Sequence, residues 1–287
     1  MLDGSHLPTL QRSRGRASAS FAHLRGAVRL VDLHQSGSAR IMLPRTAGPV
    51  PEAVFLNTSG GLTDGDTLSF GLHIGEGARV LATTQTSERA YAARRDAAQV
   101  SVTATVLAGG RLDWLPQETI LYQSSNLSRR TEVDLGPGAQ CLLAETIILG
   151  RHAMGESVTD AHLQDHRMIR RNGRPVWAET LHLTPEVLTS PSPALLGGAR
   201  ALAVVCLVAQ GAEDAVAPLR AALTQAGTTG AVSGWDGKCV VRLVASNGWP
   251  LRQQLARILH ILSGRNLPRV WQSATPTAIG PSIGEPS

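Results

Sequence analysis

The sequence predicts a mainly β fold, with strands stacked in superhelical, β-helix-like layers and about two α-helices in the C-terminal third. Segments in which apolar and polar residues alternate recur through the first half of the chain, and a period of two indicates a strand with one buried face. Short glycine turns at Gly77, Gly110 and Gly138 separate these segments, at steps of 33 and 28 residues. A strand–turn–strand unit is therefore repeated along the chain.

Each glycine turn stands between two predicted strands. The preceding strands are Thr67–Ile74, Gln99–Leu107 and Leu127–Leu135, and the following strands are Arg79–Thr86, Leu112–Leu115 and Gln140–Leu149. Further upstream, strands are expected at Leu24–Leu33 and Ala39–Leu43. Residues 1–23 are expected to form a disordered leader.

The C-terminal third has a different pattern. Apolar runs predict strands at Ala201–Gln210 and Gly237–Ser246. The segment Trp249–Ser263 predicts the clearest helix, because its large apolar residues fall on one stripe, and Glu213–Ala226 has a weaker helical tendency. Residues 24–272 are thus expected to form one β-rich domain, followed by a disordered tail at 273–287.

A hairpin signal precedes this third of the chain. Asn172-Gly173 lies between two strand-like runs, and both positions tolerate a positive φ. Pro175 lacks a backbone N–H, so we expect it on an edge strand.

Composition limits the classes of function. The chain has 287 residues, of which 43% are hydrophobic, 17% charged and 3% aromatic, and its formal net charge is +5. The arginines are spread out and lack interleaved aromatics, which argues against nucleic-acid binding and leaves acidic protein partners. Three distant cysteines indicate a reducing compartment. No run of about 18 apolar residues predicts a membrane span, and we expect a cytoplasmic protein.

A glycine-rich loop from Asn57 to Asp66 connects two predicted strands. A phosphate-binding loop is rejected, because its glycine spacing is absent and a strand follows. Asp64 and Asp66 would share a face of an extended segment. Two interpretations stay open: a pair of carboxylates that handles a cation, or a tight turn with solvated aspartates.

Four acids stand beside or within apolar strand-like runs: Glu118, Glu145, Glu156 and Glu179. Buried acids are costly unless they are paired, hydrated or bound to a cation. Each could pair with an arginine, and Arg151 is one partner for Glu145. The acids could also line a hydrated acidic passage, or serve as paired carboxylates of a β-helical glycoside hydrolase. No nucleophile elbow, zinc spacing or P-loop is present.

Several motifs then occur in a fixed order. They are Leu56–Asp66, Thr83-Thr84-Gln85 with Tyr91, Leu115–Leu121, Glu145 with Gly150-Arg151 and Gly155-Glu156, and Pro268–Trp271. In this order, over about residues 24 to 272, they resemble the UreD (UreH) family of urease accessory proteins. The matching motif positions are Ser59, Gly60, Gly61, Gly65, Thr83, Tyr91, Pro116, Glu118, Gly150, Arg151 and Glu156. Arg89 departs from the family, where we expect a lysine.

The resemblance implies a non-catalytic chaperone of urease maturation, an urease accessory protein in nitrogen compound metabolism. Such proteins bind the urease apoenzyme and UreF, connect through UreF to the GTPase UreG, and support nickel insertion. They hold no tight cofactor, so nickel would bind only transiently. The family is also implied to have a β-rich, superhelically stacked fold with two helices.

The resemblance further implies an internal, water-filled passage for nickel. The matching passage positions are Asp64, Asp66, Thr84, Gln85, Glu145 and Glu179. Nickel binds nitrogen and sulfur more tightly than oxygen, so these groups would hold it weakly, as transit requires. The alternative from a different class remains the glycoside hydrolase.

Overall fold

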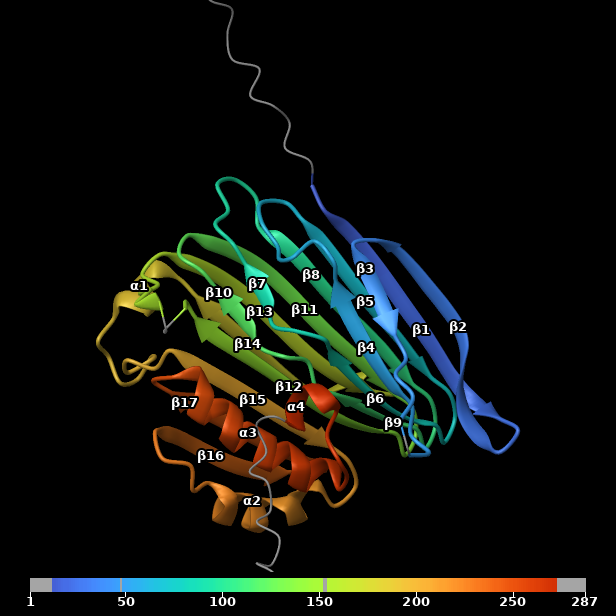
Figure 1. The fold of residues 1–287 in the computed structure, drawn as a ribbon. Helices are drawn as coiled ribbons and strands as arrows, with labels where there is room; N and C mark the ends of the chain where they lie inside the picture. The colour runs from blue at the N-terminus through green and yellow to red at the C-terminus, as the bar shows by residue number, and fades with distance from the viewer. Residues whose placement is uncertain (1–11, 47, 152–153, 273–287) are drawn as a thin grey trace, which may run out of the picture.

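The computed structural model describes residues 12–46, 48–151 and 154–272 and consists of two stacked β-sheets with helices at one end (Figure 1). The 7-stranded sheet has the order β14 (Arg174–Leu183), β13 (Ala161–Arg171), β11 (Ser125–Leu135), β8 (Ala98–Val106), β5 (Thr67–Ile74), β1 (Arg14–Leu24) and β2 (Ala27–Gly37). We call it the first sheet.

The second sheet has 10 strands. Its main path is β16 (Thr228–Trp235), β17 (Lys238–Ala245), β15 (Ala201–Val208), β12 (Gln140–Leu149), β9 (Arg111–Trp114), β6 (Arg79–Thr84), β4 (Glu52–Asn57) and β3 (Ala39–Met42). Two short strands, β7 (Glu88–Ala90) and β10 (Thr119–Leu121), pair with each other, and β10 also pairs with β12.

From β4 to β13 the chain passes repeatedly between the two sheets. In the first sheet β5, β8, β11 and β13 are parallel neighbours, and in the second sheet β4, β6, β9 and β12 are parallel neighbours. We call one passage through both sheets a coil. Each coil therefore stacks on the previous one, which confirms the predicted stacked layers.

The predicted glycine turns stack on one another. Gly77 donates its N–H to the carbonyl of Ala108 at 2.9 Å, and Gly109 donates to Pro137 at 2.9 Å. Gly77, Gly109 and Gly138 have φ values of 62°, 66° and 67°. In the second turn Gly109, not Gly110, has the positive φ, so the equivalent position is one residue earlier than the sequence spacing predicted.

Strand β1 corrects the prediction of a disordered leader up to residue 23. Its inward positions include Ala17, Ala19 and Phe21, which are buried. Two of these three are alanines, so the segment has the period of a strand but little of its usual hydrophobicity. The leader interpretation cannot hold from residue 14 onwards, and residues 1–11 lie outside the described part of the chain.

The first predicted strand is also displaced. The expected strand at 24–33 is β2, which begins at Ala27 after a turn in which Arg25 and Gly26 have positive φ. The turn separates β2 from β1, with which it pairs in antiparallel fashion. The tail at 273–287 lies outside the described residues.

The hairpin and the C-terminal elements follow the prediction closely. Asn172 and Gly173 connect β13 to β14 with φ values of 50° and 75°. Strand β14 is an edge strand, as expected for the strand that holds Pro175. Helix α3 (Gly248–Ser263) is the predicted long helix, and Gly264 ends it with a φ of 65°.

The weaker helical segment is shorter than expected. It forms the 3₁₀-helix η2 (Ala212–Ala215) and the helix α2 (Val216–Ala222), which has Pro218 in its first turn. Two short helices, α1 (Pro185–Thr189) and α4 (Arg269–Gln272), were not predicted. Their lengths of 5 and 4 residues are too small for a periodic signal.

The apolar core has two parts. One lies between the two sheets and includes Phe21, Phe55 and Trp114. The other lies on the far side of the second sheet, where Leu255 and Leu259 of α3 are buried. Within the described residues, no helix is long and apolar enough to cross a membrane.

Candidate functional site

A group of charged side chains lies inside the molecule, between the two sheets. Arg129 on β11 and Asp165 on β13 are directly paired in the sheet, and both are buried. Arg129 donates from Nε to Oδ1 of Asp165 at 3.1 Å. Its Nη1 lies 2.7 Å from Oε2 of Glu145 on β12 and donates to Thr119 at 3.0 Å. One guanidinium thus connects the carboxylates of both sheets.

The charges continue from this centre to the surface. Asp165 also accepts from Arg167 of the same strand. Arg167 lies 3.4 Å from Glu179 on β14, which accepts in turn from Arg242 on β17. The side chain of Arg242 is 56% exposed. Three acids and three arginines therefore form a continuous chain, which we call the charge row: Glu145, Arg129, Asp165, Arg167, Glu179 and Arg242.

Two small cavities lie near the buried end of the charge row, and one of them adjoins it. The first has a volume of ≈ 60 Å³ and is lined by Asn57, Gln85 and other residues near the glycine-rich loop. The second has a volume of ≈ 40 Å³ and is bounded by Arg129 and Glu145. Both cavities are large enough for a water molecule. We call them the loop cavity and the inner cavity.

Two polar residues, Thr84 and Glu88, line both cavities. Glu88 accepts from Nδ2 of Asn57 at 3.2 Å and from the backbone N–H of Arg89 at 3.1 Å. Thr84 accepts from the backbone N–H of Gln117 at 2.9 Å. The two residues join the cavities, and Glu88 was not among the predicted site residues.

The pKa values of the buried acids shift in different directions at the cavities and in the charge row. Burial raises the pKa of Glu88, and Asn57 and the N–H of Arg89 oppose that rise. Burial likewise raises the pKa of Glu145 against the attraction of Arg129. Burial also favours the neutral form of Asp165, but Arg129 and Arg167 outweigh it and hold the pKa of Asp165 below its usual value. The charge row therefore has a firmly ionised centre and a cavity end where protonation is easier.

The predicted passage residues occupy different parts of this region. Thr84, Gln85 and Glu145 line the cavities, and Glu179 stands near the exposed end of the charge row. Arg129, Asp165 and Arg167 were missed. A signal for them existed, because each stands at an inward position of its alternating strand, on the same face as buried apolar residues such as Leu127 and Leu163.

Asp64 and Asp66 lie in the turn before β5 and are buried, not solvated. Asp66 accepts the backbone N–H groups of Ser13 at 2.7 Å and Thr63 at 2.9 Å. Asp64 accepts those of Arg95 at 2.9 Å and Asp96 at 2.7 Å. The tight-turn interpretation is thus corrected in one respect: the aspartates tie the loop to neighbouring segments instead of facing water.

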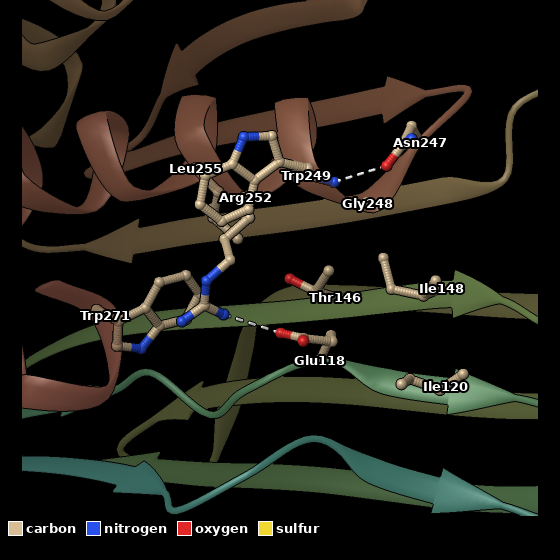
Figure 2. A pocket seen from close by; sticks show the side chains of 10 residues that line it. All are labelled: Glu118, Ile120, Thr146, Ile148, Asn247, Gly248, Trp249, Arg252, Leu255 and Trp271. Carbon is tan, nitrogen blue, oxygen red and sulfur yellow. Dashed lines mark hydrogen bonds and ion pairs between the residues drawn. The ribbon is translucent and has the colours of Figure 1, made fainter. Parts of the chain in front are cut away.

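The other predicted acids also pair with arginines. Glu156 accepts from Arg151 at 2.8 Å, so Arg151 is not the partner of Glu145 as the sequence suggested. Figure 2 shows Glu118 facing Arg252 at 3.0 Å, in a surface pocket of ≈ 250 Å³ between α3 and the second sheet. The guanidinium of Arg252 also lies 4.7 Å from the ring centre of Trp271.

Several motif positions come together where successive coils end. Leu62 donates its N–H to Arg89 and accepts from Tyr91, and Gly150 donates to Leu121 at 2.8 Å. Tyr91 contacts Gly61 so closely that a Cβ there would lie 2.3 Å from its ring. The family glycines and Tyr91 therefore support the stacking of coils.

Among the residues that the structure describes, no group of three or more His, Cys, Asp or Glu side chains is arranged to hold a metal ion. The charge row is built from alternating acids and arginines instead. Any cation that entered it would meet carboxylates already neutralised by guanidinium groups.

Comparisons with known proteins agree with the motif order. A family model described as UreD urease accessory protein matches residues 13–272. A urease accessory protein UreD of Cereibacter sphaeroides is 58% identical over 92% of this chain and 96% of its own length. Proteins of the same name from Paracoccus denitrificans and a Jannaschia species are 49% and 45% identical, covering 92% and 95% of this chain and 93% and 100% of their own lengths. The chain belongs to the UreD family of urease accessory proteins.

Proposed function

We propose that the chain is a cytoplasmic scaffold for urease maturation. It binds the urease apoenzyme and UreF, connects through UreF to UreG, and supports the GTP-dependent insertion of nickel. Membership of the UreD family supports a role in urease maturation. The four acids considered for a glycoside hydrolase each pair with an arginine, so the scaffold is the function that the observations favour.

We further propose that nickel passes through the interior, from the loop cavity to the inner cavity and along the charge row. The observation that carries this proposal is that Thr84 and Glu88 line both cavities, beside the apolar core. At its other end the charge row reaches solvent, because the side chain of Arg242 is 56% exposed. Asp64 and Asp66 remain proposed entry residues, and the charge of Asp66 acts on Glu88.

The chemistry of the lining suits transit. Carboxylate, hydroxyl and carboxamide oxygens bind nickel less tightly than imidazole or thiolate ligands. An ion that leaves its site readily can pass from Glu88 to Glu145, whereas a tight site would retain it.

The maturation role is tested by expressing the urease operon with and without the chain. Urease activity, the nickel content of purified urease, and co-purification of the chain with urease and UreF are measured together. We expect loss of the chain to leave urease expressed but without nickel. Full activity and no co-purification would contradict the role and favour the hydrolase alternative.

The passage is tested by the double variant Glu145→Leu with Asp66→Leu. It should impair urease activation while the complex with UreF and urease still forms. The matched control is Asp32→Leu with Asp134→Leu, which changes two exposed acids in the same way. Normal activation by the first variant would rule out a passage through these residues.

A further inference from the structure

Arg129 stands between the inner cavity and the rest of the charge row. One row of paired residues in the first sheet runs Leu68, Val100, Arg129 and Asp165, across β5, β8, β11 and β13. The first three of these line the inner cavity, and Asp165 does not. The guanidinium of Arg129 therefore closes the route at the point where the cavity ends.

The two contacts of this guanidinium are unequal. Asp165 receives two of its nitrogens, which is the bidentate geometry that fixes an arginine firmly. Oε2 of Glu145 lies 2.7 Å from Nη1 but outside hydrogen-bond geometry. The other oxygen of Glu145 accepts from Nε1 of Trp114 at 3.3 Å, so only charge attraction ties Glu145 to Arg129, and its carboxylate is the one that another cation can take over.

A second, independent observation points to a polar ligand in the inner cavity. The carboxamide Nε2 of Gln117 is buried and has no acceptor among the described residues, and Gln117 lines this cavity. Gln117 is 7% exposed. A buried donor of this kind takes a water molecule as its partner. Within a mostly apolar lining, Gln117 therefore marks a place for a water molecule beside Glu145.

The charges of the buried centre already balance. Glu145 and Asp165 face Arg129 and Arg167. A divalent cation at Glu145 would stand close to the guanidinium of Arg129, and two like charges repel strongly in a buried site. Nickel and Arg129 cannot share this carboxylate.

We propose that Arg129 is a resident cation that occupies the place of nickel at Glu145, and that a passing ion must displace it. The inference rests on the proposed passage and adds a residue that opposes nickel entry. Arg129 is a positioning residue in this scheme, since it holds the carboxylate ready without binding the ion.

The test measures nickel binding by the full chain in equilibrium dialysis against nickel chloride. The variant R129M with D165N removes one positive and one negative charge, so the buried centre stays neutral. We expect it to bind nickel about tenfold more tightly than the unaltered chain. Adding E145Q should return the affinity to its starting value. The matched control is R170M with E132Q, which removes a paired arginine and acid of the same sheet outside the charge row and should leave the affinity unchanged.

If the double variant does not fold, R129K decides the question. Lysine keeps the charge but loses the bidentate contact with Asp165, so nickel should displace it more easily and bind about threefold more tightly. The proposal is overturned if a folded variant shows no gain in nickel affinity, or if the gain persists after E145Q is added. If nickel affinity rises as expected but urease activation does not need the chain, the proposed function fails and the displaceable cation stands.

Discussion

Two groups of buried acids in this molecule are neutralised in different ways. In the glycine-rich loop, Asp64 and Asp66 accept hydrogen bonds mainly from backbone N–H groups, and Arg12 reaches Asp64 only at 3.4 Å. Between the sheets, Glu145 and Asp165 face the guanidinium groups of arginines. Backbone donors cannot move without moving the chain, whereas a side-chain cation can change partners. The loop acids are thus suited to holding a structure, and the interior acids to exchanging a cation.

The largest expected effect is the loss of Asp165. Asp165→Ala leaves Arg129 and Arg167 buried beside each other without their shared carboxylate. Breaking a buried ion pair from one side costs about 3–5 kcal/mol, and we expect a loss of that size in the free energy of unfolding. Urea denaturation of the full chain measures it. The triple variant Asp165→Ala with Arg129→Met and Arg167→Met should recover part of the loss. Equal instability of both would show that packing, and not charge, makes the difference.

A smaller effect is expected for the loop. Asp66→Ala leaves the N–H groups of Ser13 and Thr63 without their acceptor. An unsatisfied buried donor costs about 1–3 kcal/mol. Water can reach these two N–H groups in part once the carboxylate is removed, so we expect a loss of about 2 kcal/mol in the free energy of unfolding. Asp66→Asn keeps one acceptor oxygen and should lose less. If Asp66→Ala lost less unfolding free energy than Asp66→Asn, these hydrogen bonds would not be what holds the loop.

The sequence predicted the stacked strand layers better than it predicted which acids pair with which arginines. Alternation, glycine turns and the apolar stripe of α3 are local signals, and each matched an element of the structure. Strand β1 was missed because its inward residues include the small Ala17 and Ala19. A period of two is present there, but the hydrophobicity that usually accompanies it is not.

The ion pairs depend on which coils stack together. Glu145 was expected beside Arg151, six positions along the chain, but its partner is Arg129, on the strand before β12. Irregular steps between coils hide this neighbour from sequence spacing. The alternation of β11 already indicated that Arg129 points inward. Charged residues at inward strand positions are therefore as informative as acids inside apolar runs.

The pH dependence of stability should separate two acids whose pKa values shift in opposite directions, Asp64 and Glu88. The N–H of Arg95 leads the groups that lower the pKa of Asp64 below its ordinary 3.8. Its stabilising contribution is present above that value and is lost as pH falls through the folded pKa. Burial raises the pKa of Glu88 above its ordinary 4.5. The folded chain then binds this proton more tightly, so stability falls as pH rises from the unfolded pKa through the folded one.

The variant Glu88→Gln checks the second slope. Its urea midpoint should fall less than that of the unaltered chain between about pH 4.5 and neutral pH, because the variant has no carboxyl to ionise in the cavity. Asp64→Asn serves as the matched control: it should lower the stability at neutral pH and change the pH slope only at more acidic pH. If the variant and the unaltered chain showed the same dependence of stability on pH, the carboxylate of Glu88 in the unaltered chain would be well solvated.

The smallest effect is expected at the exposed pair of Arg151 and Glu156. The side chain of Arg151 is 53% exposed, and its guanidinium lies 4.9 Å from the ring centre of Tyr122. Exposed ion pairs contribute about 0–1 kcal/mol, so Arg151→Ala should change the urea midpoint little and should do so less at high salt. This variant sets the scale for the comparison, because it removes an arginine from an acid without leaving a buried charge. A loss as large as that of Asp165→Ala would mean that motif position, and not burial, decides how much an ion pair contributes.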